Sequence, residues 1–557
     1  MVKSEKYTGA AGASARGRKE RGEVMSAATG TVLKHKWFLY ATEFFAGMSV
    51  MAVELGASRL LSPYFSSSQI VWTVIIGTIM IAMALGNVLG GRLADRKPDP
   101  GGLYLRILIA AVWIALIPLA GKYVIIGVTL LLASFVNANF LVWASLASCL
   151  LLFVFPLLLL GTVTPSLAKF TVDSLDDSGR TVGTLGALNT VGSIIGTFLP
   201  TFVTIPAVGT SLTFLIFAGI LLLLALAYFL PLRKKLGVCA AAAAVFILCC
   251  VFGRGGSLAF WERGIVYEDE SIYNYLQVKE DDRSLILSTN VMFGVQSIMM
   301  KDGGLTGMYY DYAFGAPLLA GLSEEDPCDM LILGMGTGTY ARMCGEFFPK
   351  AEIEGVEIDE KITKLAYDLF ELPESVRVTT FDGRAFLDLT DRKYDVIMVD
   401  AYRDITFPFQ MSTVEFFTKV RDRLKDGGVM VVNMNMYSEN ANSINDYLAD
   451  TVAAVFPCVC AAPVAGTGNM ELFASREPGM RENLAAALPE LKNGDLRTAA
   501  GWLADSLTDY EDGGLRLTDD KAPVEMLGMR VIDEIITEEL AYYRQLFREE
   551  GLSALLG

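Results

Sequence analysis

The chain has 557 residues, of which 53% are hydrophobic, and carries a formal net charge of −16 with a single histidine, His35. One histidine excludes histidine-dependent catalysis and His-based metal sites, so acid–base chemistry must come from Asp, Glu, Tyr, Lys or Cys. The charge is unevenly spread: residues 1–254 hold 20 Lys and Arg against 10 Asp and Glu, whereas the remaining 303 residues hold 26 against 52. Two chemically different halves therefore join near Gly253.

The first 36 residues are mostly Gly, Ala, Ser, Lys and Arg and predict a basic, flexible tail. No apolar stretch with a small-residue cleavage site occurs in the usual window, so we expect no removable signal peptide. The positive charge of the tail favours the cytoplasmic side of a membrane.

Residues 37–254 predict a polytopic α-helical membrane domain of seven spans. The runs that are long and apolar enough to cross a bilayer are about 37–61, 69–94, 103–121, 140–163, 182–206, 208–231 and 236–253. A shorter run at about 123–138 leaves an eighth span open, and the count ranges from six to eight. Glu54, within the first span, is expected either to face a cavity or to pair with Arg59.

Basic connections orient this domain. Arg92–Lys97, Lys169 with Arg180, and Arg233–Lys235 share the cytoplasmic side if the tail is inside and there are seven spans. Seven spans from an inside start place the acidic half outside. One span fewer keeps the acidic half in the cytoplasm.

Residues 255–330 predict a leader rich in short antiparallel strands, at 271–278, 284–287 and 293–299. An aromatic cluster, Met308–Tyr312, follows and carries one acid, Asp311. A helix to Leu322 is expected after it.

Residues 331–477 predict an α/β Rossmann-like domain with a nucleoside site. An apolar strand ends in Gly334, Gly336 and Gly338, a helix follows, and a second strand ends at Glu357, 19 residues after the last glycine. The glycines let the backbone approach a ligand, and an acid at the second strand accepts hydrogen bonds from ribose hydroxyls.

Two further strands end in acids at the same edge of the expected sheet. Asp382 precedes Gly383 at the end of one strand, where a carboxylate can accept from an adenine amino group, and Asp400 ends the strand 395–399. The last segment, 478–557, is expected to be helical, with a turn-rich interruption at 517–525.

The order of these motifs resembles the spermidine synthase family of polyamine aminopropyltransferases. The closer resemblance is to the bacterial form in which that domain follows a multi-span, transporter-like membrane segment. It implies a class I S-adenosylmethionine-type fold, decarboxylated S-adenosylmethionine as co-substrate, no prosthetic group and no metal. The implied reaction moves an aminopropyl group to an amine such as putrescine and releases methylthioadenosine.

The resemblance also implies roles for individual residues. Glu357 holds the ribose and Asp382 the adenine, with Gln296 near the nucleoside, and Asp400 orients and deprotonates the attacking amine. The residues implied to bind the cationic acceptor are Asp404, Tyr309, Asp311 and Tyr402. The acidic half suits a dication bound by carboxylates.

Three positions depart from the family pattern. Thr337 stands where the family has an aspartate that contacts the aminopropyl ammonium, the loop from Asp400 to Asp404 is one residue longer, and Asn274 replaces a glutamine. Two alternatives therefore stay open. One is a methyltransferase using S-adenosylmethionine, and the other is a transport or sensing protein that binds a nucleoside or polyamine without turnover.

The expected partners are the lipid bilayer and a small cationic amine, with no nucleic acid and with a homo-oligomer possible in principle. We expect a multi-pass cell-membrane protein with a cytoplasmic N-terminus. The soluble domain is expected in the cytoplasm, because nucleoside sulfonium substrates are normally kept there.

Overall fold

The computed structural model describes residues 36–172, 178–253, 257–291, 294–402, 407–436 and 440–550, so the basic tail lies outside the described residues. Two compact units make up the chain. The first, called the helical unit, holds residues up to 61, 72–130 and 143–256. The second, called the sheet unit, holds residues 62–71, 131–142 and the chain from Ser257 onward.

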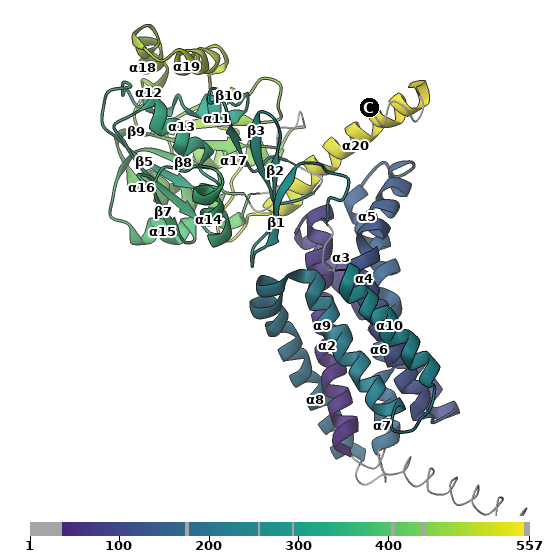
Figure 1. Cartoon of the computed structure of the whole chain (residues 1–557). Helices are drawn as coiled ribbons and strands as arrows, with labels where there is room; N and C mark the ends of the chain where they lie inside the picture. The colour runs from purple at the N-terminus through teal and green to yellow at the C-terminus, as the bar shows by residue number, and fades with distance from the viewer. Residues whose placement is uncertain are drawn as a thin grey trace, which may run out of the picture. The chain divides into compact units, whose positions relative to one another are not determined.

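The helical unit is a bundle of long apolar helices, drawn in purple to teal in Figure 1. Five helical stretches within the described residues are long and apolar enough to cross a membrane, and the helix at Leu236–Phe252 is shorter. The elements are α2 (Lys36–Phe65), α3 (Gln69–Arg96), α4 (Pro100–Ala133), α5 (Phe140–Cys149), η1 (Leu150–Val154), α6 (Phe155–Gly161), α7 (Val163–Thr171), α8 (Ser178–Leu199), η2 (Pro200–Thr204), α9 (Ile205–Phe229) and α10 (Leu236–Phe252).

Helix boundaries differ from the expected spans in two places. The runs at 103–121 and 123–138 share one helix, α4, which ends at Ala133. Lys122 interrupts the hydropathy there but not the helix, because lysine is a good helix former.

The runs at 182–206 and 208–231 lie on one helical stretch of 52 residues, Ser178–Phe229. At 1.5 Å per residue this stretch would be about 78 Å long if straight, more than twice the roughly 30 Å of a hydrocarbon core. It is not straight, because Gly209 has φ 80° and ψ 167°, which breaks the helix.

The buried carboxylate of the helical unit is Glu43 rather than Glu54. Glu43 has no exposed surface, and its Oε1 accepts from Thr164 Oγ1 at 2.5 Å and from Asn189 Nδ2 at 2.9 Å. Glu54 is half-buried. Hydropathy alone does not tell which face of α2 turns inward, so the sequence did not single out Glu43, and the role of Glu54 stays a prediction.

The leader of the sheet unit is a four-stranded antiparallel sheet in the order β1-β2-β3-β4. Its strands are β1 (Ile265–Glu270), β2 (Tyr275–Glu280), β3 (Ser284–Ser288) and β4 (Ser297–Met300). The expected strand at 271–278 begins only at Tyr275, because Ser271 donates its N–H to the Asn274 carbonyl in a turn. The short helices α11 (Tyr309–Ala313) and α12 (Ala316–Leu319) follow.

The main sheet has eight strands in the order β12-β10-β11-β9-β8-β5-β6-β7 (Figure 1). Strands β5 to β9 pair in parallel, whereas β11 is antiparallel to β9 and β10 is antiparallel to β11. The strands are β5 (Cys328–Leu333), β6 (Ala351–Glu357), β7 (Arg377–Thr380), β8 (Tyr394–Val399), β9 (Leu424–Met434), β10 (Cys458–Pro463), β11 (Met470–Ser475) and β12 (Thr508–Asp509).

Helices connect and cover these strands. They are α13 (Thr339–Phe347), α14 (Glu360–Asp368), α15 (Gly383–Leu389), η3 (Phe409–Met411), α16 (Val414–Arg423), α17 (Ile444–Ala453), α18 (Met480–Ala487), η4 (Leu488–Glu490), α19 (Gly494–Ser506) and α20 (Val524–Glu550). Strand order reverses at β5, which has β6 on one side and β8 on the other. In open α/β sheets ligands bind at the carboxyl ends of the strands at such a switch point.

Candidate active site

The glycine turn between β5 and α13 lies at this switch point. Gly334 has φ 81°, and a Cβ there would lie 2.6 Å from the carbonyl oxygen of Asp400. A Cβ on Gly336 would lie 2.4 Å from Ser297 Oγ in the leader. The turn therefore needs glycine at both positions, and it brings the end of β8 and the start of β4 together at the carboxyl end of β5.

Glu357, at the end of β6, is buried and faces the turn. Its Oε2 accepts from the N–H of Gly336 at 2.9 Å, and its Oε1 accepts from the N–H of Asp359 at 3.0 Å. Burial raises the pKa of Glu357 to about 7, against the lowering effect of these N–H donors. Each carboxylate oxygen has two lone pairs, so one on each oxygen remains for a diol.

Asp382 follows β7, and Gln296 directly precedes β4. Asp382 caps α15, accepting from the N–H of Ala385 at 2.8 Å. The carbonyl of Gln296 lies 4.0 Å from the position of a Cβ on Gly336 and accepts from the Tyr310 hydroxyl at 3.2 Å. The glycine turn, Glu357 and Gln296 thus meet at one edge, as the sequence predicts, and Asp382 follows the neighbouring strand β7.

Asp400 follows β8 and is partly buried. Its Oδ2 accepts from the Tyr309 hydroxyl at 2.6 Å, and its Oδ1 accepts from Asn433 Nδ2 at 3.0 Å. Burial raises the pKa of Asp400 to about 7, although both hydrogen bonds act to lower it. A carboxyl group with a pKa near neutrality at the carboxyl end of a strand is suited to accept a proton.

Tyr309 and Asp311 have different environments despite their proximity in sequence. Tyr309 donates to Asp400, and burial keeps the pKa of Tyr309 well above the usual value, so it is a neutral donor. Asp311 is buried with its oxygens accepting from Thr306 N and Oγ1 and from Gly307 N, at 2.7 to 3.0 Å. Asp311 thus holds the loop before α11.

Tyr402 is fixed against β9, since its hydroxyl donates to the carbonyl of Asn433 and accepts from the N–H of Asn435. Asp404 lies outside the described residues. Asn274, on the leader, donates to Asp359 Oδ2 at 3.1 Å, so it supports the loop that carries Glu357.

Two polar groups beside the site lack hydrogen bonds to the described residues. Thr337 is 1% exposed and its Oγ1 has no partner, and Glu471 is fully buried with neither carboxylate oxygen paired. Asn433 and Glu471 escaped the sequence analysis because they lie inside strands β9 and β11, away from any motif. A glutamate in the apolar run Met470–Ser475 was the available signal.

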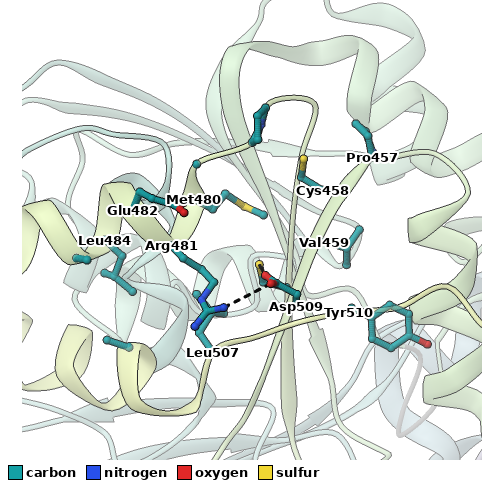
Figure 2. A pocket seen from close by; sticks show the side chains of 15 residues that line it. Pro457, Cys458, Val459, Met480, Arg481, Glu482, Leu484, Leu507, Asp509 and Tyr510 are labelled. Atoms are coloured by element: carbon teal, nitrogen blue, oxygen red, sulfur yellow. Dashed lines mark hydrogen bonds and ion pairs between the residues drawn. The ribbon is translucent and has the colours of Figure 1, made fainter.

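A cavity of about 740 Å³ lies elsewhere in the sheet unit, lined by β10, β12 and α18 (Figure 2). Figure 2 shows Arg481 directed at Asp509, with Nη1 and Oδ2 3.4 Å apart. Its lining, within the part of the chain that the structure describes, contains none of the predicted site residues.

Comparison with known proteins gives the family. Residues 318–478 match the spermine/spermidine synthase domain. The chain is 48% identical over 348 residues to a probable polyamine aminopropyl transferase from Bifidobacterium longum, a match covering 59% of this chain and 77% of that protein. The chain belongs to the polyamine aminopropyltransferase family.

More distant relatives of this aminopropyltransferase are also found. A polyamine aminopropyltransferase from Vibrio vulnificus is 29% identical over 220 residues, covering 38% of this chain and 71% of that protein. The crystal structure of a probable spermidine synthase from Corynebacterium glutamicum is 20% identical, covers 46% of this chain and 97% of that chain, and has a TM-score of 0.37. The family resemblance drawn from the sequence and the prediction of a transferase enzyme are confirmed.

Proposed function

We propose that this enzyme transfers the aminopropyl group of decarboxylated S-adenosylmethionine to a small diamine such as putrescine. The observation that carries the proposal is the Asp400 carboxyl, held by Tyr309 and Asn433 at the carboxyl end of β8. Its surroundings raise the pKa of Asp400 to about 7, which suits a group that must take a proton from an ammonium.

The reaction needs alignment and a base. One ammonium of the diamine loses a proton to Asp400, and the free amine then attacks the methylene carbon next to the sulfonium sulfur. The carbon–nitrogen bond forms as the carbon–sulfur bond breaks, and that electron pair stays on sulfur in methylthioadenosine. The proton now carried by Asp400 leaves to solvent before the next turnover.

The nucleoside end of the site fits the co-substrate. The two backbone N–H groups orient the Glu357 carboxylate, whose remaining lone pairs are available to the ribose hydroxyls. Asp382 is positioned for the adenine amino group. Thr337 offers a hydroxyl without a partner among the described residues where the family has an aspartate, so the aminopropyl ammonium must find its carboxylate elsewhere.

Product analysis tests the function. Purified full-length protein is incubated with decarboxylated S-adenosylmethionine and a panel of di- and polyamines, and the mixture is analysed by mass spectrometry. Methylthioadenosine together with an amine heavier by one aminopropyl group is the expected result. A product heavier by one methyl group, formed only with S-adenosylmethionine, would instead identify a methyltransferase.

We further propose that the helical unit spans the cell membrane, with its basic connections in the cytoplasm. Large apolar side chains on its surface support this, since Met80, Phe202 and Val251 are 65%, 65% and 63% exposed. Such exposure is costly in water and favourable in lipid. The described connections between α3 and α4 and between α9 and α10 carry Arg and Lys, as cytoplasmic loops do.

The sheet unit is proposed to face the cytoplasm, where its sulfonium co-substrate is kept. The connection between α2 and α3 belongs to the sheet unit, and α3 separates it from the basic connection between α3 and α4, so a spanning α3 puts the sheet unit and the basic connections on opposite sides. A cytoplasmic sheet unit is therefore the alternative to cytoplasmic basic connections. Fusions at the C-terminus test the side: a fluorescent protein that folds only inside should be bright, and active alkaline phosphatase at the same position would place the sheet unit outside.

A further inference from the structure

Glu43 is a buried carboxylate of the helical unit that the proposed aminopropyl transfer does not use. The side chain has no exposed surface. Its Oε1 accepts from Thr164 Oγ1 at 2.5 Å and from Asn189 Nδ2 at 2.9 Å, whereas its Oε2 has no hydrogen-bond partner among the described residues. Burying a carboxyl oxygen without a partner costs free energy, so an unpaired oxygen of this kind indicates a missing ligand, ion or proton.

Helices α2 and α8 pack with their backbones in close contact directly beside Glu43. A Cβ on Gly192 would lie 2.1 Å from the carbonyl oxygen of Phe44, and a Cβ on Gly196 would lie 2.1 Å from that of Met48. Small residues allow this close approach between membrane helices. The contacts advance in the same direction along both helices, so α2 and α8 run parallel and start at the same end of the bundle.

Glu43 lies well inside the helical unit along the bundle. At about 1.5 Å per residue it is roughly 10 Å from the start of α2, Thr164 is roughly 10 Å from the end of α7, and Asn189 is roughly 16 Å from the start of α8. Trp37, in the first turn of α2, is exposed, and tryptophan is enriched at membrane interfaces. Counted from that turn, a hydrocarbon core of roughly 30 Å encloses Glu43. Ionisable residues at such depths are expensive and mark the paths of ions, protons or substrates.

The hydrogen bonds to Glu43 come from neutral side chains. Arg106 on α4 is directed elsewhere, because it donates to Thr162 Oγ1 at 2.8 Å and to Ser166 Oγ at 3.1 Å. Positions 162 and 166 share one helix face, and Thr164 between them lies on the opposite face. The other titratable groups of α2, α4, α7 and α8 at this end of the bundle are Lys36, Tyr40, Tyr104, Lys169 and Arg180. Among the described residues, no positive group donates a hydrogen bond to Oε2 of Glu43.

These contacts leave one oxygen of Glu43 available. A carboxyl oxygen has two lone pairs, and those of Oε1 are taken by Thr164 and Asn189. With a proton on Oε2 the group is neutral, as apolar surroundings require, and without the proton its negative charge needs a cation in contact. The cluster of Met48, Ala52 and Phe217 further along α2 is apolar and supplies no such charge.

We propose that Glu43 is a cation–proton exchange site, at which Oε2 holds either a proton or a cation. When the cation binds, the O–H bond of the carboxylic acid breaks, the electron pair stays on Oε2, and the proton leaves to water. One positive charge replaces another, so the site stays neutral. A single carboxylate neutralises one charge, which fits an inorganic monovalent ion or one ammonium group. This exchange is separate from the transfer reaction and rests on the proposed membrane arrangement of the helical unit.

Infrared spectroscopy of the full-length protein in lipid bilayers tests the proton. The wild type should show the carbonyl stretch of a protonated carboxylic acid that is missing in Glu43→Gln, whose amide oxygen can still accept from Thr164 and Asn189. Addition of NaCl, KCl or 1,4-diaminobutane dihydrochloride at constant pH should remove this band when the added cation binds. Glu54→Gln, on the same helix and half-buried, is the matched control and should leave the band and its response unchanged.

Proton movement across a bilayer tests the exchange. Each salt is added outside proteoliposomes whose acidic interior contains a pH indicator, and the rate in protein-free liposomes is subtracted. A salt that removes the infrared band should make the interior more alkaline with the wild type and with Glu54→Gln, and Glu43→Gln should abolish the response. A response to NaCl or KCl identifies an inorganic cation, and a response only to 1,4-diaminobutane identifies an ammonium group.

Several results overturn the inference. The wild type and Glu43→Gln show the same infrared band, no salt changes the band, or a salt changes it without any change of interior pH. An equal pH response in Glu43→Gln does so too. Product analysis of the transfer reaction on the same preparations, in which both variants should match the wild type, separates these failures from failure of the proposed function.

A second variant controls for a folding defect in Glu43→Gln. Glu43→Asp restores an acid at the same position, so it should restore a carboxylic-acid band that responds to the same salt. If Glu43→Asp elutes from a gel-filtration column as the wild type does but shows neither band nor response, the glutamate has a structural role and the inference fails.

Discussion

Replacement of Asp400 by asparagine removes the negative charge of the side chain and keeps its hydrogen bonds. In the wild type Oδ1 accepts from Asn433 and Oδ2 accepts from Tyr309. In Asp400→Asn the amide oxygen still accepts from Asn433, and the new NH₂ donates to the Tyr309 oxygen, since a hydroxyl is both donor and acceptor. The geometry is therefore retained, and what disappears is the negative charge and the proton acceptor.

The expected loss of activity is therefore that of removing a general base. Removing a general base lowers the rate by about 10²- to 10⁴-fold, which we expect for kcat/KM of methylthioadenosine release. Nucleoside affinity should remain, because Glu357 and Asp382 follow other strands. Asp388→Asn, an exposed aspartate on α15, is the matched control. Activity of Asp400→Asn within about threefold of the wild type would refute the assignment of Asp400 as base.

The same substitution has a signature in stability. The pKa of Asp400 is raised from 3.8 to about 7, so the folded state holds a proton that the unfolded state has released in this window. Folding stability from this group is therefore present below about pH 4 and is lost as pH rises towards 7. Thermal melts of Asp400→Asn should show a smaller decline over that range, and identical pH dependence in both proteins would contradict the raised pKa.

Other substitutions give further expectations. Glu357→Gln should weaken methylthioadenosine binding by at least ~1 kcal/mol in titration calorimetry, the cost of a lost hydrogen bond to a charged group, and equal affinities would remove the ribose assignment. Tyr309→Phe removes a hydrogen bond that lowers the pKa of Asp400, so the acidic limb of the pH profile of kcat/KM should move to higher pH. If the limb does not move, the ionisation that it reports is not that of Asp400. Thr337→Val should leave unfolding free energy unchanged within about 0.5 kcal/mol, because its hydroxyl has no partner among the described residues, whereas Thr339→Val loses two hydrogen bonds to Ile298 and should cost roughly 1–3 kcal/mol in denaturant unfolding.

The nucleoside half of the proposed site could be predicted from the local sequence, because its residues are close in the chain and lie at turns. The glycines need positive φ and close backbone approach, and an acid ending a buried strand is a strong pattern. Those requirements fix Gly334, Gly336 and Glu357 within a single β-α-β unit, which the structure reproduces.

The half of the proposed site that would bind the acceptor amine could not be predicted from the local sequence in the same way. Asn433 reaches Asp400 only through the pairing of β9 with β8, a contact between residues more than 30 positions apart. The role of Asp311 at the amine site, which the family resemblance implied, stays a prediction; in the structure its carboxylate accepts from Thr306 and Gly307 in the loop before α11. The burial of Glu43 could not be predicted either, because hydropathy gives the extent of a helix but not its rotation.

Helix α10, at 17 residues, is at the lower limit of what can cross a bilayer. It is the last helix before the sheet unit, and in the proposed membrane arrangement the side on which that unit lies selects the pool of amines that the enzyme can reach. Inside, the enzyme competes for diamines that the cell makes, and transfer adds to its internal polyamine store. Outside, the enzyme would act on diamines arriving from the surroundings and would depend on export of its sulfonium donor.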